Sequence, residues 1–367
     1  MENSSIRFLF FLLLPLIICC NKKKSNGTAA TEISTRIVKQ NLQHVWEILW
    51  GPDDHIWFTE RDGKISKLNP TSGTIVFSST INETSPSGEG GLLGMALHPD
   101  FLNNGFLYIV YNYSSANGYK EKLVRYTFSN NSITNPTTII ENIAASGIHN
   151  GSRIRVVNES GGVKIYYTTG DASNATSAQD LNSRNGKIIR LNADGSIPAD
   201  NPIAGNPLWS YGHRNPQGLV FANNKLYESE HGPNIEDEVN IIEKGRNYGW
   251  PSVNGPCDAG ETSFCSTNNI KEPIWSSGDN TIAVCGIDYY NNDKIPEWKN
   301  SILMTTLKDA SLRQLKLSAD GNSIASTSIY FKNDYGRLRD ICISPSGNVY
   351  ICTSNGGNDD KIIEISK

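Results

Sequence analysis

The chain has 367 residues, of which 38% are hydrophobic and 19% are charged, and its formal net charge is −4. This composition excludes disorder beyond the N-terminal arm, and the absence of a basic stripe in the sequence argues against a nucleic-acid binder. The length would accommodate two ordinary domains, but all-β propellers routinely exceed the usual domain size, so we predict one large domain.

The first twenty residues have the pattern of an export signal. An apolar run over residues 8–18 ends at Cys19 and Cys20 and is followed by three lysines. The run is too short to span a bilayer comfortably, so we expect a signal peptide over residues 1–20 in preference to a transmembrane helix. Cys20, or less favourably Cys19, resembles a bacterial lipobox cysteine, and the alternative is a plain secretory peptide.

Residues 21–40 are then expected to form a flexible tether, and residues 41–367 the folded domain. The protein is predicted to be exported, either to the periplasm, to the outer membrane through a lipid on Cys20, or into the medium. Apart from that lipid, no membrane contact is expected.

From residue 45 onwards the chain repeats a unit of an apolar strand, a turn and a second β-branched or aromatic strand. Six copies are found, which begin near Val45, Leu92, Ile154, Gly218, Gly286 and Ile341. Outer strands follow several copies, at residues 63–68, 122–128, 187–191 and 312–317. The pattern predicts an all-β, six-bladed β-propeller with about four antiparallel strands per blade, whose polar loops converge at one end of the channel.

Five cysteines remain after the N-terminal pair, an odd number for an oxidising compartment. Cys257 and Cys265 flank a short polar loop that a disulfide could close, and they are the favoured pair. Cys342 and Cys352 lie in consecutive strand-like segments, where a cross-strand bridge and two buried thiols are both open. Cys285 stays unassigned, and no cysteine spacing points to a structural zinc.

Four short polar signatures separate strand-like segments over residues 149–251. They are His149-Asn150-Gly151, Gly-His-Arg-Asn-Pro-Gln-Gly at 212–218, Glu-His-Gly-Pro at 230–233 and Asn-Tyr-Gly-Trp-Pro at 247–251. Buried polar side chains are unfavourable unless they are hydrogen-bonded, so these signatures predict loops that converge on a polar ligand. Trp50, Trp209 and Trp250 could stack on a ring of such a ligand, although aromatic residues of propellers lie more often in the core.

Further motifs accompany these signatures: residues 88–101 (Gly-Glu-Gly-Gly-Leu-Leu-Gly-Met-Ala-Leu-His-Pro-Asp-Phe), Gly170-Asp171, residues 179–182 (Gln-Asp-Leu-Asn) and residues 186–188 (Gly-Lys-Ile). In this order they resemble the soluble quinoprotein aldose sugar dehydrogenases, over about residues 45–365. The resemblance implies pyrroloquinoline quinone (PQQ) and calcium as cofactors, a small-molecule aldose as substrate and an external electron acceptor. It also implies oxidation of the anomeric hydroxyl to a lactone by hydride transfer to the quinone.

His149 matches the catalytic histidine of that family. Hydride transfer from C1 of a sugar requires a base for the hydroxyl proton, and histidine suits this role near neutral pH. On the bare sequence, His149 would more often be interpreted as a loop histidine that caps a turn beside Gly151. His213 is the weaker candidate, and we expect it to support Arg214 and Asn215.

PQQ carries three carboxylates and an electron-poor dicarbonyl, so its site needs cationic and amide donors. Segments that match the cofactor-binding loops of the family supply Arg214, Asn215, Lys308, Arg337 and Arg339. Arg214 is also placed among the catalytic residues with His149, because charge develops at the reduced carbonyl. An isolated Arg-x-Arg pair is usually solvent-exposed, but Arg337 and Arg339 directly precede an inner strand.

Calcium prefers oxygen ligands, including main-chain carbonyls, and the Gly232-Pro233 turn can direct two carbonyls towards an ion shared with the quinone. The acidic residues 236–238, with Glu238 foremost, and Tyr248 resemble a second, structural calcium region of the family. A short acidic run is, however, more often simply exposed.

Two residues depart from the family pattern. Glu89 stands where better-known members have a glutamine near the quinone, and Ile148 replaces the acidic residue that precedes the base in the soluble glucose enzymes. A carboxylate near an anionic cofactor is unfavourable unless it is protonated or paired with arginine or calcium. Glu89 is therefore a candidate quinone contact whose fit depends on its partners.

Two alternative functions use the same loops. A non-enzymatic exported propeller could bind a glycan or a protein, because the fold alone does not specify quinone chemistry. A calcium-dependent propeller hydrolase of sugar lactones has no need of Lys308 with Arg337 and Arg339. Convergence of these cations and Arg214 on one pocket with His149 would favour the quinoprotein.

Overall fold

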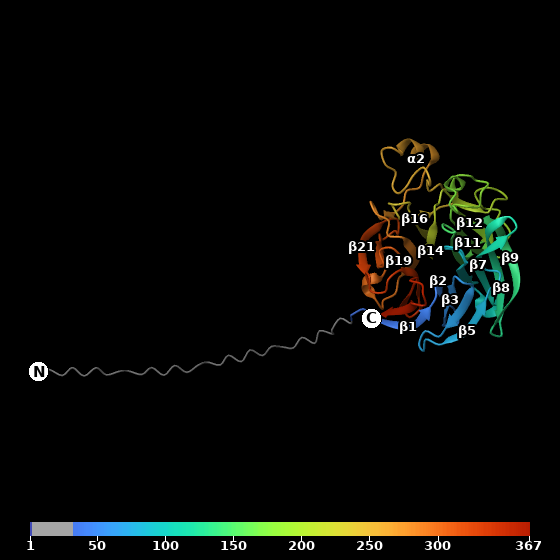
Figure 1. The fold of residues 1–367 in the computed structure, drawn as a ribbon. Helices are drawn as coiled ribbons and strands as arrows, with labels where there is room; N and C mark the ends of the chain where they lie inside the picture. The colour runs from blue at the N-terminus through green and yellow to red at the C-terminus, as the bar shows by residue number, and fades with distance from the viewer. Residues whose placement is uncertain (2–31) are drawn as a thin grey trace. The chain divides into compact units, whose positions relative to one another are not determined.

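Six four-stranded antiparallel sheets form the blades of a propeller (Figure 1). The computed structural model describes Met1 and residues 32–367, and residues 33–367 make up the propeller. The prediction of a six-bladed all-β propeller is confirmed. The expected signal peptide and its Cys20 lie outside the described residues, as do residues 21–31 of the expected tether.

The blades follow one another along the chain. The first two consist of β2 (Val45–Trp50), β3 (Ile56–Glu60), β4 (Lys64–Leu68) and β5 (Ile75–Thr80), then β6 (Leu92–Leu97), β7 (Phe106–Ser115), β8 (Gly118–Ser129) and β9 (Ser132–Ala144). The third and fourth consist of β10 (Gly151–Glu159), β11 (Gly162–Thr169), β12 (Lys187–Asn192) and β13 (Leu208–Tyr211), then β14 (Pro216–Ala222), β15 (Lys225–Glu230), β16 (Glu238–Ile242) and β17 (Trp275–Ser276). The last two consist of β18 (Val284–Tyr290), β19 (Ser301–Thr306), β20 (Leu312–Leu317) and β21 (Ile324–Tyr330), then β22 (Leu338–Ile343), β23 (Val349–Thr353), β24 (Asp360–Ser366) and β1 (Ser34–Leu42).

The ring of blades closes through its innermost strands. Each packs against the innermost strand of the next blade, and the sixth packs against the first, in the order β2, β6, β10, β14, β18 and β22. The sixth blade is completed from the other end of the chain, because β1 pairs with β24 and Ser34 lies opposite Ser366. Residues 34–40, expected in the tether, therefore belong to a strand. That strand is mostly exposed, and Val38 and Leu42 are among its few buried hydrophobic residues. Its sequence therefore has no apolar pattern from which a strand could be predicted.

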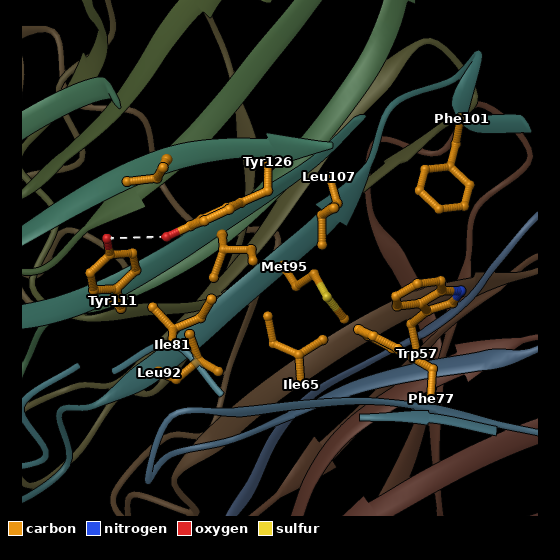
Figure 2. Close-up of a cluster of buried hydrophobic side chains, with 12 residues drawn as sticks. Trp57, Ile65, Phe77, Ile81, Leu92, Met95, Phe101, Leu107, Tyr111 and Tyr126 are labelled. Atoms are coloured by element: carbon orange, nitrogen blue, oxygen red, sulfur yellow. Dashed lines mark hydrogen bonds between the residues drawn. The ribbon is translucent and has the colours of Figure 1, made fainter. Parts of the chain in front are cut away.

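Hydrophobic clusters fill the spaces between neighbouring blades. Figure 2 shows the cluster between the first two, where Trp57 and Ile65 face Met95 and Leu107. All four side chains are fully buried, and burial of a large apolar side chain stabilises a fold by about 1.5–3 kcal/mol. Most residues of the innermost strands β2 and β6 are buried, because neighbouring blades cover both of their faces.

A buried ion network crosses the channel. Arg153 on β10 is fully buried, and its Nη1 lies 2.7 Å from Glu47 Oε2 on β2 and 2.9 Å from Asp340 Oδ2 on β22. Its Nε donates to the carbonyl oxygen of Gln217 on β14 (2.8 Å). Burial raises the pKa of Glu47 to about 7, although Arg153 and Arg155 act in the opposite direction. One guanidinium group thus joins four of the six blades.

The helical elements are short: α1 (Phe101–Asn104), α2 (Thr262–Asn268) and the 3-10 turns η1 (Ala175–Ala178) and η2 (Pro296–Trp298). Among the described residues, no helix is long and apolar enough to cross a membrane. Helix α2 lies outside the ring of blades, in the connection between β16 and β17 (Figure 1).

The cysteines follow the predicted pattern in part. A disulfide joins Cys257 to Cys265 and closes the connection that carries α2, so this pair is confirmed. Cys285, Cys342 and Cys352 are buried free thiols. Of the two interpretations left open for the consecutive strands β22 and β23, the structure therefore shows two thiols and not a bridge.

Candidate active site

The loops that carry the polar signatures meet at one mouth of the channel. The backbone N–H of Glu89, before β6, donates to the carbonyl oxygen of Gly147, before β10 (2.7 Å). The backbone N–H of Asp171, after β11, donates to the carbonyl oxygen of Arg214, before β14 (2.8 Å). Loops of three consecutive blades thus contact one another here, as the propeller pattern predicts.

His149 is held against a carboxylate that comes from another loop of its own blade. Its Nδ1 lies 2.9 Å from Asp171 Oδ1, and Asp171 is buried. His149 has a φ of 57°, in a region that residues other than glycine rarely adopt and that clusters at functional sites. An ionised carboxylate only accepts hydrogen bonds, so Nδ1 carries the proton and Nε2 keeps a lone pair. The two residues have the arrangement of a base and its orienting carboxylate.

Asp171 was not among the predicted site residues. Its second oxygen, Oδ2, accepts a hydrogen bond from Trp250 Nε1 (2.9 Å), and Oδ1 also accepts from the backbone N–H of Ser173 (2.9 Å). The only signal in the sequence was its place in the Gly170-Asp171 motif, since its partners lie on distant segments. A close approach explains the glycine: a Cβ on Gly170 would lie 2.0 Å from the carbonyl oxygen of His149.

A buried lysine anchors the loop that carries Asp171. Lys187 on β12 is 1% exposed, and its ammonium group donates to three backbone carbonyl oxygens, those of Ser177, Ala178 and Asn185. Burial lowers the pKa of Lys187 to about 7. These bonds fix residues 177–185 and so hold the loop after Asp171 in place.

Four arginines lie at this mouth without carboxylate partners: Arg61, Arg214, Arg337 and Arg339. Within the described part of the chain, none of them forms a salt bridge. The Nε atoms of Arg61, Arg214 and Arg339 are buried and have no hydrogen-bond partner there. Burial, and then the positive charge of Arg339, lower the pKa values of Arg61 and Arg337. The mouth thus concentrates positive charge that the protein does not neutralise with ion pairs.

Arg61 was not predicted, because its Glu-Arg-Asp-Gly segment has the appearance of an ordinary turn. It follows β3, and its Nη1 donates to the carbonyl oxygen of Gly88 (2.8 Å), which supports the turn that carries Glu89. A cavity of about 270 Å³ lies beside this turn and is lined by Arg61, Gly88 and His44.

Glu89 is exposed and lines a cavity of about 10 Å³ together with Asn150 and Arg339. Burial lowers the pKa values of the surrounding arginines Arg61, Arg214 and Arg337, and the negative charge of Glu89 partly offsets this effect. Glu89 therefore lies in an arginine neighbourhood, although among the described residues it forms no ion pair with an arginine.

Asn215 and Lys308 occupy different positions at the mouth. Asn215 is 1% exposed, and its Oδ1 accepts from the backbone N–H of Gly151 (3.2 Å), which ties the loop of the histidine to β14. Lys308 follows β19 and is exposed, with its Nζ 3.0 Å from Thr281 Oγ1. Among the described residues its hydrogen bonds join it to Thr281 and Ile282, and none joins it to the arginines.

Three of the four residues predicted to hold calcium line one cavity of about 10 Å³, namely Gly232, Glu238 and Tyr248. That volume accommodates about one water-sized particle. Pro233 follows directly and is exposed. The hydroxyl of Tyr248 is already engaged, because it donates to the carbonyl oxygen of Ile241 (2.6 Å) and accepts from the backbone N–H of Glu243 (2.8 Å). The backbone carbonyl oxygen is therefore the atom of Tyr248 that remains to bind an ion.

Asp237 has a different role from its acidic neighbours. Its Oδ1 accepts from the backbone N–H of Gly232 (2.9 Å), and its Oδ2 accepts from those of Ile282 and Ala283 (2.6 and 2.7 Å). Three backbone donors therefore satisfy this buried carboxylate, which fastens the Gly232-Pro233 turn to the fifth blade.

A buried acidic cluster lies beside this cavity and consists of Glu228, Glu230 and Glu238 around Asn240. Asn240 Nδ2 lies 3.0 Å from Glu238 Oε2 and 3.2 Å from Glu228 Oε2, while Glu228 Oε1 and Asn240 Oδ1 are buried without partners. Burial, and then the charge of Glu230, raise the pKa of Glu238 to about 8 and that of Glu228 well above its ordinary value. In the described chain no arginine or lysine side chain pairs with these carboxylates.

His213 joins this cluster. It is fully buried, its Nδ1 lies 2.9 Å from Glu230 Oε1, and its ring stacks on Tyr248. Glu230 in turn accepts from the backbone N–H of Arg214 (2.7 Å), so the contact between His213 and Arg214 runs through Glu230. Ligand atoms of His213, Glu228 and Glu230 lie within 4.8 Å of one another, close enough to share a metal ion.

The three candidate tryptophans lie in different places. Trp250 contacts Asp171 at the site and lies beneath the guanidinium group of Arg214, which is 5.3 Å from the ring centroid. Trp50 ends β2 and lines a cavity of about 480 Å³ at the opposite mouth. Trp209 on β13 packs against Arg190 in the third blade. Trp250 is therefore the tryptophan placed to act at the site.

The fold is a six-bladed propeller, and one mouth of its channel brings the His149–Asp171 pair together with arginines that have no carboxylate partners. Comparison with known proteins specifies the class, because a sequence model of the glucose/sorbosone dehydrogenases matches residues 42–364. The chain belongs to this family, that of the quinoprotein sugar dehydrogenases, and is a sugar oxidoreductase. The non-enzymatic alternative is not supported.

Relatives match along nearly the whole chain. Quinoprotein glucose dehydrogenase B of Acinetobacter calcoaceticus is 31% identical over 89% of this chain and 86% of its own length. Aldose sugar dehydrogenase YliI of Escherichia coli is 29% identical over 95% and 96%. The solved structure of PQQ-bound aldose sugar dehydrogenase from Streptomyces coelicolor is 29% identical, covers 91% of this chain and 98% of its own, and has a TM-score of 0.78.

Proposed function

We propose that the protein oxidises the anomeric hydroxyl of aldose sugars to lactones, with PQQ as hydride acceptor and His149 as general base. The observation that carries the proposal is the position of the His149–Asp171 pair beside arginines that have no carboxylate partners. A polyanion bound at this mouth would satisfy those arginines, and PQQ has three carboxylates. The family and the PQQ-bound relative support the same conclusion.

The side chains divide into those that bind and those that move a proton. The residues that would hold PQQ are Arg61, Glu89, Arg214, Asn215, Lys308, Arg337 and Arg339. Bound PQQ supplies an electrophilic carbonyl system that accepts a hydride and its electron pair. His149 Nε2 takes the proton of the anomeric hydroxyl, and Asp171 stabilises the imidazolium that forms. The positive charge of Arg214 favours the reduced, more negative state of its ligand.

The two departures from the family pattern acquire a physical interpretation. Ile148 is 44% exposed and offers His149 no carboxylate, but His149 Nδ1 already lies 2.9 Å from Asp171 Oδ1. Asp171 supplies that carboxylate from another loop. Glu89 lies among arginines, and we propose that it limits their mutual repulsion while leaving the mouth positively charged.

Loss of one arginine is expected to weaken quinone binding. A charge-assisted hydrogen bond contributes about 1.5–3 kcal/mol, so Arg339→Gln should raise the Kd for PQQ by about 10- to 100-fold. Quenching of tryptophan fluorescence by added PQQ measures this Kd without any sugar. Arg125→Gln, a change on β8 of the second blade, is the matched control and should bind PQQ as the wild type does.

The function itself is tested with the full protein loaded with calcium and PQQ. Reduction of an artificial dye is expected only when an aldose is present. Tight quinone binding without sugar-dependent turnover would contradict the substrate class, and the absence of quinone binding would contradict the quinoprotein assignment for this chain.

We further propose a structural calcium ion beside Glu238 and Tyr248, where the acidic cluster leaves Glu228 Oε1 and Asn240 Oδ1 unpartnered, and a second ion at the Gly232-Pro233 turn. Buried carboxylates without counter-charge are unfavourable, and calcium takes oxygen ligands of this kind. The Gly232-Pro233 carbonyl oxygens would face an ion shared with the quinone.

Removal of calcium with a chelator is expected to lower Tm by about 3–5 °C, because calcium present well above its Kd stabilises the folded state that binds it. Glu228→Gln should abolish most of this difference, because it removes a charged ligand. Glu141→Gln, an exposed change on β9, should leave it intact. Equal Tm values with and without calcium in the wild type would exclude the site.

We propose that the protein is exported, with residues 1–20 as its signal peptide and Cys20 as the candidate lipidation site. The apolar run over residues 8–18 and the Cys257–Cys265 disulfide support this location, since disulfides persist in oxidising compartments. Cell fractionation with incorporation of labelled palmitate separates three outcomes: a periplasmic protein, a lipoprotein, and a cytoplasmic protein that would refute export.

A further inference from the structure

Two amide side chains without an assigned role meet beside the active site. Gln179 opens the Gln-Asp-Leu-Asn motif, and Asn247 opens the Asn-Tyr-Gly-Trp-Pro motif of the next blade. Gln179 Nε2 donates to Asn247 Oδ1 (3.0 Å), and Asn247 Nδ2 donates to Gln179 Oε1 (2.8 Å). The two amides thus form a reciprocal pair, and Asn247 is buried.

This amide pair fixes the backbone of Trp250. Gln179 Nε2 also donates to the carbonyl oxygen of Trp250 (2.6 Å), and the backbone N–H of Trp250 donates to the carbonyl oxygen of Gly212 (3.0 Å). Asn247 Oδ1 additionally accepts from the backbone N–H of Gly249 (3.0 Å). Both backbone polar groups of Trp250, its N–H and its carbonyl, are therefore hydrogen-bonded, which fixes the position of the residue.

The indole N–H of Trp250 donates a hydrogen bond to the carboxylate that orients the base. Trp250 Nε1 donates to Asp171 Oδ2 at 2.9 Å, while Asp171 Oδ1 accepts from His149 Nδ1 at 2.9 Å. Asp171 is 2% exposed. Within the described chain it forms one salt bridge, with His149. Each oxygen of this carboxylate therefore has its own side-chain donor, one from the base and one from the indole.

We propose that Trp250 is a positioning residue of the base: by holding Asp171 Oδ2, it fixes the plane of the carboxylate and so the tautomer and orientation of His149. The inference rests on the proposed function. Without the indole N–H, only the backbone N–H of Ser173 still restrains the carboxylate. The carboxylate can then rotate away from His149 Nδ1, and the contact that requires the proton on Nδ1 is weakened. A smaller fraction of the protein then presents an unprotonated Nε2 to the sugar hydroxyl.

The rival role for Trp250 is a stacking platform for the pyranose. The guanidinium group of Arg214 lies 5.3 Å from the indole centroid, so one face of the ring is already occupied. The indole N–H is also directed at Asp171 and is not free for a sugar hydroxyl. These contacts favour the positioning role.

Trp250→Phe keeps an aromatic ring but removes the donor. We expect kcat to fall by about 10- to 100-fold, as for a small misplacement of a catalytic group, while KM for the aldose changes less than about twofold. Trp250→His retains a ring N–H and should recover part of the loss. Trp209→Phe is the matched control, because Trp209 also packs against an arginine but lies away from the site, and it should leave kcat unchanged.

The second readout is independent of turnover. In the protein without quinone, ¹⁵N NMR of the imidazole, assigned with His149→Asn, is expected to show the Nδ1–H tautomer of His149 in the wild type and a mixture in Trp250→Phe. An unchanged tautomer in Trp250→Phe, or a raised KM with kcat unchanged, would overturn the positioning role. A shifted tautomer in a protein that never oxidises sugar would retain it and refute the proposed function instead.

Discussion

Replacing His149 with asparagine is expected to lower kcat for aldose oxidation by about 10²- to 10⁴-fold, the contribution of a positioned general base. Asparagine can still donate an amide N–H to Asp171, so the loop keeps its anchor, but it cannot take a proton near neutral pH. Dye reduction at saturating aldose and PQQ measures the loss.

The control for this change is His55→Asn, because His55 lies in the turn between β2 and β3 and its ring contacts a backbone oxygen of that turn. It should turn over sugar as the wild type does. PQQ should quench tryptophan fluorescence in His149→Asn with an unchanged Kd. If kcat of this variant stayed within threefold or so of the wild-type value, another group would have to be the base.

Removing the arginine of the channel should produce the largest loss of stability. Arg153→Met leaves Glu47 and Asp340 buried without their shared counter-charge, and breaking a buried ion pair from one side costs about 3–5 kcal/mol. Urea denaturation followed by tryptophan fluorescence measures the free energy of unfolding. The methionine fills much of the volume, so the lost charge accounts for most of the effect.

The loss should also depend on pH. Burial raises the pKa of Glu47 to about 7, above its value in the unfolded chain, so its contribution to stability is present at acidic pH and is lost as pH rises through 7. Without Arg153 this carboxyl becomes harder to ionise, and the destabilisation should be greater at pH 8 than at pH 6. Arg155→Met, which removes the partly exposed partner of Glu47, should cost clearly less. Equal losses for the two variants would contradict the network described here.

The inner strands of the blades were predictable, whereas the outermost strands were not. Strands β23 (Val349–Thr353) and β6 (Leu92–Leu97) are buried on both faces and therefore have continuous apolar sequences. The outermost strand β21 (Ile324–Tyr330) is mostly exposed and rich in Ser and Thr, and β1 exposes most of its residues. Backbone pairing with the neighbouring strand holds such segments, and that pairing leaves no hydrophobic pattern.

The site was predictable where a residue type stands in a recognisable loop. His149, Arg214 and Arg339 were identified in this way, and all three lie at the same mouth. Asp171 and Glu228 were missed, because a carboxylate acquires its role from partners on other segments. Asp171 accepts a hydrogen bond from Trp250, 79 positions away, and Glu228 accepts one from Asn240 on the neighbouring strand. Tyr248 shows a further limit of the sequence, because the motif does not reveal that its hydroxyl is hydrogen-bonded to the carbonyl oxygen of Ile241.

The pairing of β1 with β24 also determines when the molecule can finish folding. Ser34 bonds to Ser366, 332 positions away, so the last blade exists only after nearly the entire chain is available. Closing so long a loop is entropically unfavourable and is expected to be a late, slow step. Until then the ring stays open, and its terminal sheet edges remain unpaired and able to pair with other chains.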